Sequence, residues 1–157
     1  MLYFIVILKV DIIMKSVIQR VASAKVEVEG SVVSEIGPGL LILLGIEPDD
    51  SQSTAEALAT KIAKLRIFCD VAGKMNLSLL DIAGEALVVS QFTLLADTSH
   101  GHRPGFSKAA LPQIAEPLYN HYMRYLSKLG VKKVACGIFG AEMKVELVND
   151  GPVTIIL

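Results

Sequence analysis

The chain has 157 residues, of which 52% are hydrophobic and 20% are charged, and its net charge at pH 7 is −1. This length and apolar content suit one compact domain with its own core and disfavour a second independent domain. The near-neutral charge excludes a protein that attracts nucleic acid over its whole surface, so any RNA contact should be local.

Residues 1–13 form an apolar run that two charged residues interrupt. The run is shorter than the ~20 residues of a membrane span and lacks the basic start and cleavage site of a signal peptide. We therefore expect a cytoplasmic protein without membrane contact, with residues 1–13 as an apolar N-terminal extension and residues 14–157 as the functional domain. Cys69 and Cys136 show no disulfide or zinc spacing, and both are expected to be buried free thiols.

Residues 16–46 are expected to form strands. Apolar and charged residues alternate in the segment KVEVEG, which is typical of a strand with one buried face. A hairpin turn is expected at Glu29-Gly30, and a break is expected at residues 37–39. The segment LLILLGI that follows predicts a strand buried on both faces.

A helix is expected after these strands. Ser53 and Glu56 have the spacing of a capping box at its start. Leu58, Ile62 and Leu65 recur at helical spacing, so we expect the helix to lie on the sheet.

A further strand is expected over residues 85–92, and a polar loop over residues 98–107 leads from it to a second helix. Gly130 closes this helix, and Pro117 suits its first turn. The apolar residues that mark the second helix are Ile114, Leu118, Tyr122, Tyr125 and Leu129.

Residues 133–136, 144–149 and 153–157 are expected to be the last strands. Strands outnumber helices, and short hairpins are expected rather than regular βαβ crossovers. The predicted fold class is α+β, a single compact domain with a mostly antiparallel, barrel-like β-sheet and two main helices packed on it.

The segment Ser90-Gln91-Phe92-Thr93 places polar and aromatic residues at the end of an apolar strand. Alternation would direct Ser90 and Phe92 to one side and Gln91 and Thr93 to the other. The segment is either a pocket wall that offers hydrogen bonds or a strand that frays into a polar turn. Neither hydroxyl has evident His and Asp partners, so a serine-esterase triad is not supported.

Gly151 and Pro152 stand between two β-type runs, where each disfavours a regular ladder. They form either a tight turn or a rigid backbone wedge, since the proline ring fixes φ and glycine permits unusual dihedral angles.

His100 and His102 flank a glycine, but no carboxylate or cysteine stands at a companion spacing for a metal. His121 is expected to face solvent or to cap a helix. No Rossmann or Walker spacing is present, so neither a metal nor another cofactor is expected.

The segments SQFTLLAD and NDGPVT, in this order, resemble the two signature motifs of the D-aminoacyl-tRNA deacylase family. The resemblance extends over MKSVIQRVASAKVEVEG, GKMNLSLLD, RPGFSKAA and FGAEM, so it covers nearly all of residues 14–157. Leu95 stands where family members often carry an aromatic residue, and Gly105 replaces a frequent serine. Both motifs are nevertheless complete.

The resemblance implies a hydrolase that cuts the ester bond of D-aminoacyl-tRNA and of mischarged glycyl-tRNA, a chiral proofreading activity that rejects L-aminoacyl-tRNA. It implies a homodimer in which Gly151 and Pro152, joined by a cis bond, insert into the partner's active site and exclude an L side chain sterically. Main-chain groups around Ser90, Gln91 and Phe92 would carry the catalysis, assisted by the terminal ribose hydroxyl.

In this scheme Thr93 supports the pocket, and Phe139 and Met143 are expected as its apolar walls. The tRNA 3′ end would meet a local basic patch, either at Arg103 and Lys108 or at Lys132 and Lys133. Two other classes stay open: a module that binds an RNA end without turnover, and a metal-dependent hydrolase that uses His100 and His102.

Overall fold

The structure is a computed structural model that describes residues 14–157, so the expected extension over residues 1–13 lies outside the described residues. The described elements are, in chain order, β1 (Lys15–Val28), β2 (Ser31–Ile36), β3 (Gly39–Gly45), α1 (Gln52–Lys64), β4 (Phe68–Cys69), β5 (Met75–Leu77), β6 (Glu85–Ser90), the 3-10 helix η1 (Phe92–Leu95), α2 (Pro112–Lys128), β7 (Lys133–Cys136) and β8 (Lys144–Ile156).

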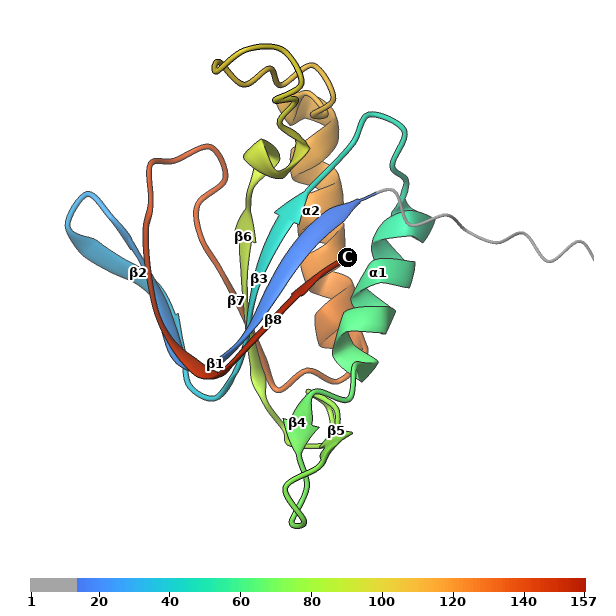
Figure 1. The fold of residues 1–157 in the computed structure, drawn as a ribbon, viewed down its shortest axis with the longest axis vertical. Coiled ribbons are helices and arrows are strands. Elements are labelled where there is room, and N and C mark those ends of the chain that lie inside the picture. Colours follow the sequence, from blue (N-terminus) through green and yellow to red (C-terminus); the bar gives the residue numbers. More distant parts are fainter. Residues whose placement is uncertain (1–13) are drawn as a thin grey trace, which may run out of the picture.

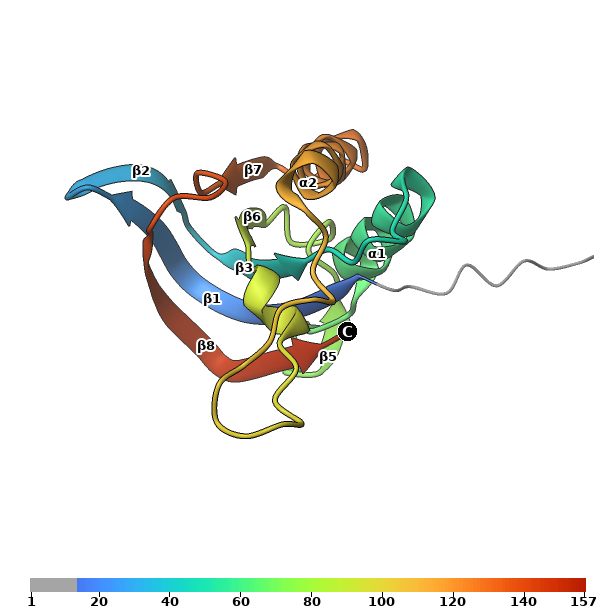
Figure 2. The ribbon, with the colours of Figure 1, turned by 90° about the horizontal axis from the view of Figure 1, so that it is seen from above.

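A strongly curled sheet of six strands is the centre of the fold (Figures 1 and 2). The long strand β1 pairs antiparallel with β3 over its first half and with β2 over its second half, while β8 pairs antiparallel along the other edge of β1. The Ser34 hydroxyl of β2 donates to the Cys136 carbonyl of β7 at 2.6 Å, which brings distant strands of the sheet together. The predicted α+β class with a barrel-like sheet and two helices is confirmed.

Two connections of this sheet are crossovers that contain a helix, so the expectation of hairpins there was wrong. Strands β3 and β6 are parallel and are joined through α1 and the small β4–β5 hairpin, and the parallel strands β6 and β7 are joined through α2. A tight turn cannot connect two parallel neighbouring strands, because the chain must first return to the end of the sheet where it started. In both crossovers a helix makes this return and covers the sheet.

Both faces of β3 are buried, as the sequence predicted, because the sheet separates two apolar clusters. Leu40, Ile42 and Leu44 face the cluster shared with α1 and α2. Leu41, between them, faces a second cluster on the inner side of the curl, together with Leu87 of β6. Successive residues of a strand point to opposite faces, so a strand between two apolar layers is apolar throughout.

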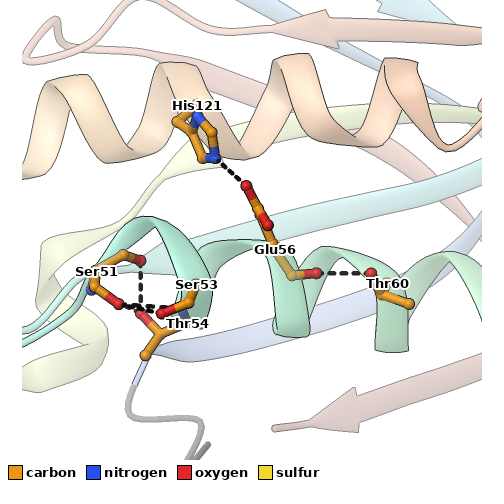
Figure 3. Close-up of polar contacts among 6 residues, drawn as sticks. All are labelled: Ser51, Ser53, Thr54, Glu56, Thr60 and His121. Atoms are coloured by element: carbon orange, nitrogen blue, oxygen red, sulfur yellow. Dashed lines mark hydrogen bonds and ion pairs between the residues drawn. The ribbon is translucent and has the colours of Figure 1, made fainter.

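Helix α1 is capped by Ser51, so the predicted capping box at Ser53 and Glu56 was wrong. The Ser51 hydroxyl accepts from the Thr54 N–H at 3.3 Å, and the Thr54 hydroxyl accepts from the Ser51 N–H at 2.8 Å (Figure 3). Glu56 instead meets the His121 ring of α2, with 2.9 Å between Oε1 and Nε2. His121 therefore links the two helices and neither faces solvent nor caps α2.

Helix α2 begins at Pro112, which places Pro117 in the second turn rather than the first. The buried stripe also differs from the prediction, because Ile114 is exposed and Tyr125 is half-buried. Gly130 follows the helix with φ of 102°, a left-handed value that suits glycine, as predicted. The residues that face the core are Ala115, Leu118, Tyr119, Tyr122 and Leu126.

The two cysteines are not both buried. Cys69 is exposed in the β4–β5 hairpin, which lies beyond the end of the main sheet, and Cys136 is half-buried in β7. The hairpin has only two and three residues in its strands, so it offers little apolar cover for a thiol. Within residues 14–157, no helix combines the length and the apolar character that crossing a membrane requires.

Replacing Tyr122 with phenylalanine is expected to raise the free energy of unfolding by about 1 kcal/mol. The Tyr122 hydroxyl is fully buried without a hydrogen-bond partner among the described residues, and burial raises its pKa above the usual range. Tyr119→Phe is the matched control, since its hydroxyl donates to the Val88 carbonyl at 2.8 Å and its loss should cost about 1 kcal/mol. Urea unfolding would measure both, and a destabilised Tyr122→Phe would contradict the assignment.

Candidate active site

The chain turns sharply at the end of β6. The strand stops at Ser90, so the alternation that was expected to continue to Thr93 does not, and Phe92 already belongs to the 3-10 helix η1. The Gln91 side-chain amide donates to the Thr93 hydroxyl, which joins two of the predicted site residues directly. The backbone turns because Gln91 has φ of −140° and ψ of 76°, outside the values of a continuing strand.

An open pocket of about 340 Å³ lies at this strand end. Ser90, Phe92 and Phe139 line it, so the structure brings these three predicted residues together. The ring of Phe92 packs edge-on against Phe106, with 5.0 Å between the centroids. The other residues that line the pocket are Ala109, Ala110, Leu111, Pro112 and Gly140.

Helix α2 positions the Phe139 wall of this pocket. The Tyr119 and Phe139 ring centroids lie 5.9 Å apart, and Tyr119 is buried. The Tyr119 hydroxyl donates to the Val88 carbonyl in β6, and burial raises the pKa of this hydroxyl, so it stays protonated as a donor. One tyrosine thus ties α2, β6 and the pocket wall together.

Two backbone N–H groups at the start of η1 have no acceptor among the described residues. Within residues 14–157, no hydrogen bond is formed by the N–H of Phe92 or of Thr93, whereas the Gln91 N–H donates to the Leu44 carbonyl at 2.8 Å. The Ser90 and Thr93 hydroxyls likewise contact no His or Asp side chain in the described part of the chain. The polar groups that this site offers are therefore main-chain donors and hydroxyls without a His or Asp partner.

Gly151 and Pro152 lie inside β8, which is one continuous strand rather than two strands joined by a turn. The register with β1 pairs Asn149 with Val21 and Thr154 with Gln19, so four residues of β8 stand opposite one residue of β1. This wide bulge exposes Gly151 and Pro152, and the bond between them is cis. In the single chain neither residue lines the pocket at Ser90.

Arg20 of β1 holds the base of this bulge. Its Nε donates to the Asp150 carbonyl at 2.8 Å and lies 3.6 Å from the Asp150 carboxylate, while Nη1 donates to the Ile67 carbonyl at 2.6 Å. Gly151 has φ of 134°, and a Cβ there would lie 3.0 Å from Arg20 Nη2. Arginine at this place therefore fixes the backbone, and glycine is required beside it.

Sequence reasoning missed Arg20, although a signal was present. Ser16, Ile18 and Arg20 alternate along β1 on its buried side, so a cation occupies an inward position of the strand pattern. A buried charge needs specific partners, and such a position therefore indicates a structural or functional anchor.

A family model described as D-Tyr-tRNA(Tyr) deacylase matches residues 17–157. The chain belongs to this deacylase family. A D-aminoacyl-tRNA deacylase of Jannaschia sp. (strain CCS1) is 63% identical over 90% of this chain and 96% of its own length. One of Deinococcus radiodurans is 56% identical over 92% of this chain and 99% of its own length.

Two solved structures resemble this deacylase-family chain. A structure titled c-Myc DNA Unwinding Element Binding Protein has a TM-score of 0.86 and 43% identity, covering 91% of this chain and 97% of that one. A probable eukaryotic D-amino acid tRNA deacylase has a TM-score of 0.82 with 14% identity, covering 92% of this chain and 98% of that one. The second likeness shows the shared fold alone.

Other candidate residues of this deacylase-family member lie away from the pocket. Met143 lines a separate depression beside the β1–β2 turn, and its sulfur lies against Gly137. Its place in the pocket wall therefore stays a prediction. His100 and His102 are exposed in the loop that precedes α2, and no group of three potential metal ligands occurs within residues 14–157.

The loop that precedes α2 and the start of β7 lie at opposite ends of the fold (Figure 1), and each is next to one of the two basic pairs proposed for tRNA. Lys133 stands opposite Glu85, five residues along β6 from Ser90, which is about 17 Å in a strand. Arg103 and Lys108 belong instead to the loop whose Phe106 lines the pocket. One patch cannot contain all four residues.

Proposed function

We propose that this member of the deacylase family hydrolyses the ester bond of D-aminoacyl-tRNA to the free D-amino acid and tRNA, and that it rejects L-aminoacyl-tRNA. Family membership over residues 17–157 is the observation that carries this proposal. The pocket that Ser90 and Phe92 of the SQFTLLAD segment help to line supports it, because its apolar walls accept varied side chains. Such a protein acts on tRNA in the cytoplasm and cleaves glycyl-tRNA too, because glycine has no side chain to exclude.

The proposed chemistry uses main-chain donors. Water attacks the ester carbonyl, the Phe92 and Thr93 N–H groups stabilise the developing oxyanion, and the terminal ribose hydroxyl assists. The bond between the acyl carbon and the ribose oxygen breaks, and the ribose oxygen takes the proton that water loses. Ser90 and Gln91 hold the strand end in place, and the Thr93 hydroxyl supports Gln91. No side-chain nucleophile, metal or other cofactor takes part.

Chiral rejection is proposed to require a homodimer. Gly151 and Pro152 are exposed on a bulge that Arg20 holds and lie away from the pocket of their own chain. In the dimer, the partner subunit's Gly151 and the partner subunit's Pro152 enter the pocket, where rigid carbonyls occupy the space of an L side chain. A D side chain points elsewhere, so exclusion requires no recognition of its identity.

The test compares matched D-tyrosyl- and L-tyrosyl-tRNA with the purified full chain. Rapid loss of the D ester is expected, with the L ester cleaved at least about 100-fold more slowly. Pro152→Ala frees the φ angle that the ring fixes and should weaken the discrimination. A chain that cleaves neither ester faster than buffer but binds uncharged tRNA would instead be an RNA-end-binding module.

Activity in excess EDTA separates the remaining alternative. The rate of the proposed reaction is expected to stay unchanged, because main-chain N–H groups rather than a metal ion stabilise the oxyanion. Loss of activity with chelator and its return with added zinc would support a metal-dependent hydrolase at His100 and His102.

A further inference from the structure

A loop with an excess of positive charge stands beside the pocket. Residues 97–108 are part of the connection between η1 and α2 (Figure 1). Asp97 and Gly105 close the loop at its base, with paired N–H···O distances of 2.8 and 2.9 Å. From Thr98 to Ala115 the sequence contains no Asp or Glu, although the whole chain has 16 acidic and 15 basic residues. Arg103 and Lys108 therefore give this segment a positive charge that the whole protein lacks.

Arg103 and Lys108 are the two cations of this loop, and they differ in their contacts. The Arg103 side chain is exposed and forms no ion pair or hydrogen bond within residues 14–157. Lys108 differs, because its Nζ lies 3.8 Å from the Asp97 carboxylate. Hydrogen bonds from the Ser99 hydroxyl and N–H hold the pKa of Asp97 below its usual value, so this carboxylate stays ionised. An exposed arginine without a partner offers a planar donor group for phosphate.

The N-terminus of α2 lies at the same mouth. Its N-cap is Leu111, which supplies no side-chain hydrogen bond, and Leu111 and Pro112 both line the pocket. Pro112 has no N–H, and the N–H groups of Ile114 and Ala115 both donate to the Leu111 carbonyl at 2.9 Å. Among the first four residues of this helix, only the Gln113 N–H therefore has no acceptor within residues 14–157. Phe106 connects this mouth to Arg103, since three residues of chain span at most ~10 Å.

We propose that this loop, which stands beside the N-terminus of α2 at the pocket mouth, binds the phosphates of the last nucleotides of the tRNA, while the ester lies in the pocket. The inference rests on the proposed function and adds the surface that holds the RNA. Lys132 and Lys133 are excluded from this contact by their distance along the sheet. Lys133 is also engaged, because its Nζ donates to the Glu35 carbonyl at 2.6 Å.

The experiment measures kcat and KM for D-tyrosyl-tRNA and for 3′-O-D-tyrosyl-adenosine, which has no phosphate. Arg103→Gln is expected to raise KM for the tRNA ester about fivefold and to make its salt dependence shallower by about 0.7–0.9 in log–log slope. Arg103→Lys keeps the charge and should restore most of the slope. The kcat/KM for D-tyrosyl-tRNA divided by that for 3′-O-D-tyrosyl-adenosine should fall about fivefold in Arg103→Gln.

Lys108 and Lys132 provide a matched pair of controls. Both side chains are similarly exposed, at 66% and 63%, and both lie within 4.0 Å of a carboxylate, but at opposite ends of the fold. Lys108→Gln should reduce the salt slope, whereas Lys132→Gln should not. Equal effects of the two changes, or an unchanged slope in Arg103→Gln, would overturn the inference. A wild-type chain that hydrolyses neither substrate would instead reject the proposed function.

Discussion

Substituting proline for Phe92 is expected to lower kcat for D-tyrosyl-tRNA about 10²–10³-fold relative to Phe92→Ala. Both changes remove the ring that packs on Phe106, but only proline removes the backbone N–H. Proline is tolerated at the first position of a helical turn, and this N–H has no acceptor in the described part of the fold. The difference between the two variants therefore reports the oxyanion donor rather than the aromatic wall.

The hydroxyl variants complete this experiment. Ser90→Ala and Thr93→Val are expected to retain kcat within about tenfold, since neither hydroxyl has a base to activate it. Urea unfolding of each variant would show that the comparison is made on folded protein. Equal kcat in the two Phe92 variants, with activity abolished in Thr93→Val, would contradict main-chain catalysis and restore Thr93 as a nucleophile.

Replacing Arg20 with lysine is expected to raise cleavage of L-tyrosyl-tRNA relative to D-tyrosyl-tRNA about tenfold or more. Lysine keeps the charge but cannot reach the Asp150 and Ile67 carbonyls together, as the guanidinium does. The bulge that carries Gly151 and Pro152 would then lose its fixed position, and steric exclusion depends on that position. The ratio of kcat/KM for the two esters is the measurement.

A second cation that joins the same strands serves as the control. Lys25 of β1 lies 3.2 Å from Glu146 of β8, but this pair is partly exposed and lies five residues along β1 from Arg20. Lys25→Gln removes one β1–β8 contact and should leave the chiral ratio unchanged. A chiral ratio that stays at the wild-type value in folded Arg20→Lys would show that Arg20 has only a structural role.

Local signals in the sequence identified turns and buried strands correctly. The hairpin at Glu29-Gly30 is present, with φ of 50° and 78°, because this pair of left-handed residues connects adjacent strands. Strand β7 occupies the predicted residues 133–136. Such features depend on residues that are neighbours in the chain, so the sequence pattern is sufficient to predict them.

The predictions of element boundaries and of buried faces failed where residues distant in the sequence determine them. The strand pattern predicted an extended chain to Phe92, but the chain turns into η1 after Gln91. The neighbouring strand end is packed closely at this point, because a Cβ added to Gly45 would lie 3.1 Å from the Gln91 carbonyl oxygen. Cys69 looked like a buried thiol, yet it lies in a hairpin outside the main sheet. Hydrophobicity along the chain contains no information about which layer covers a residue.

The sequence by itself determined the fold class, the two motifs and the family, because these depend on residue types and their order. Only the tertiary structure placed Ser90, Phe92 and Phe139 around one pocket and showed Arg20 beneath the bulge of β8. It also separated Arg103 from Lys132, which sequence reasoning had treated as equivalent. The reason is physical: a site is defined by distances between residues far apart in the chain, and those distances are set by the pairing and packing of whole strands and helices.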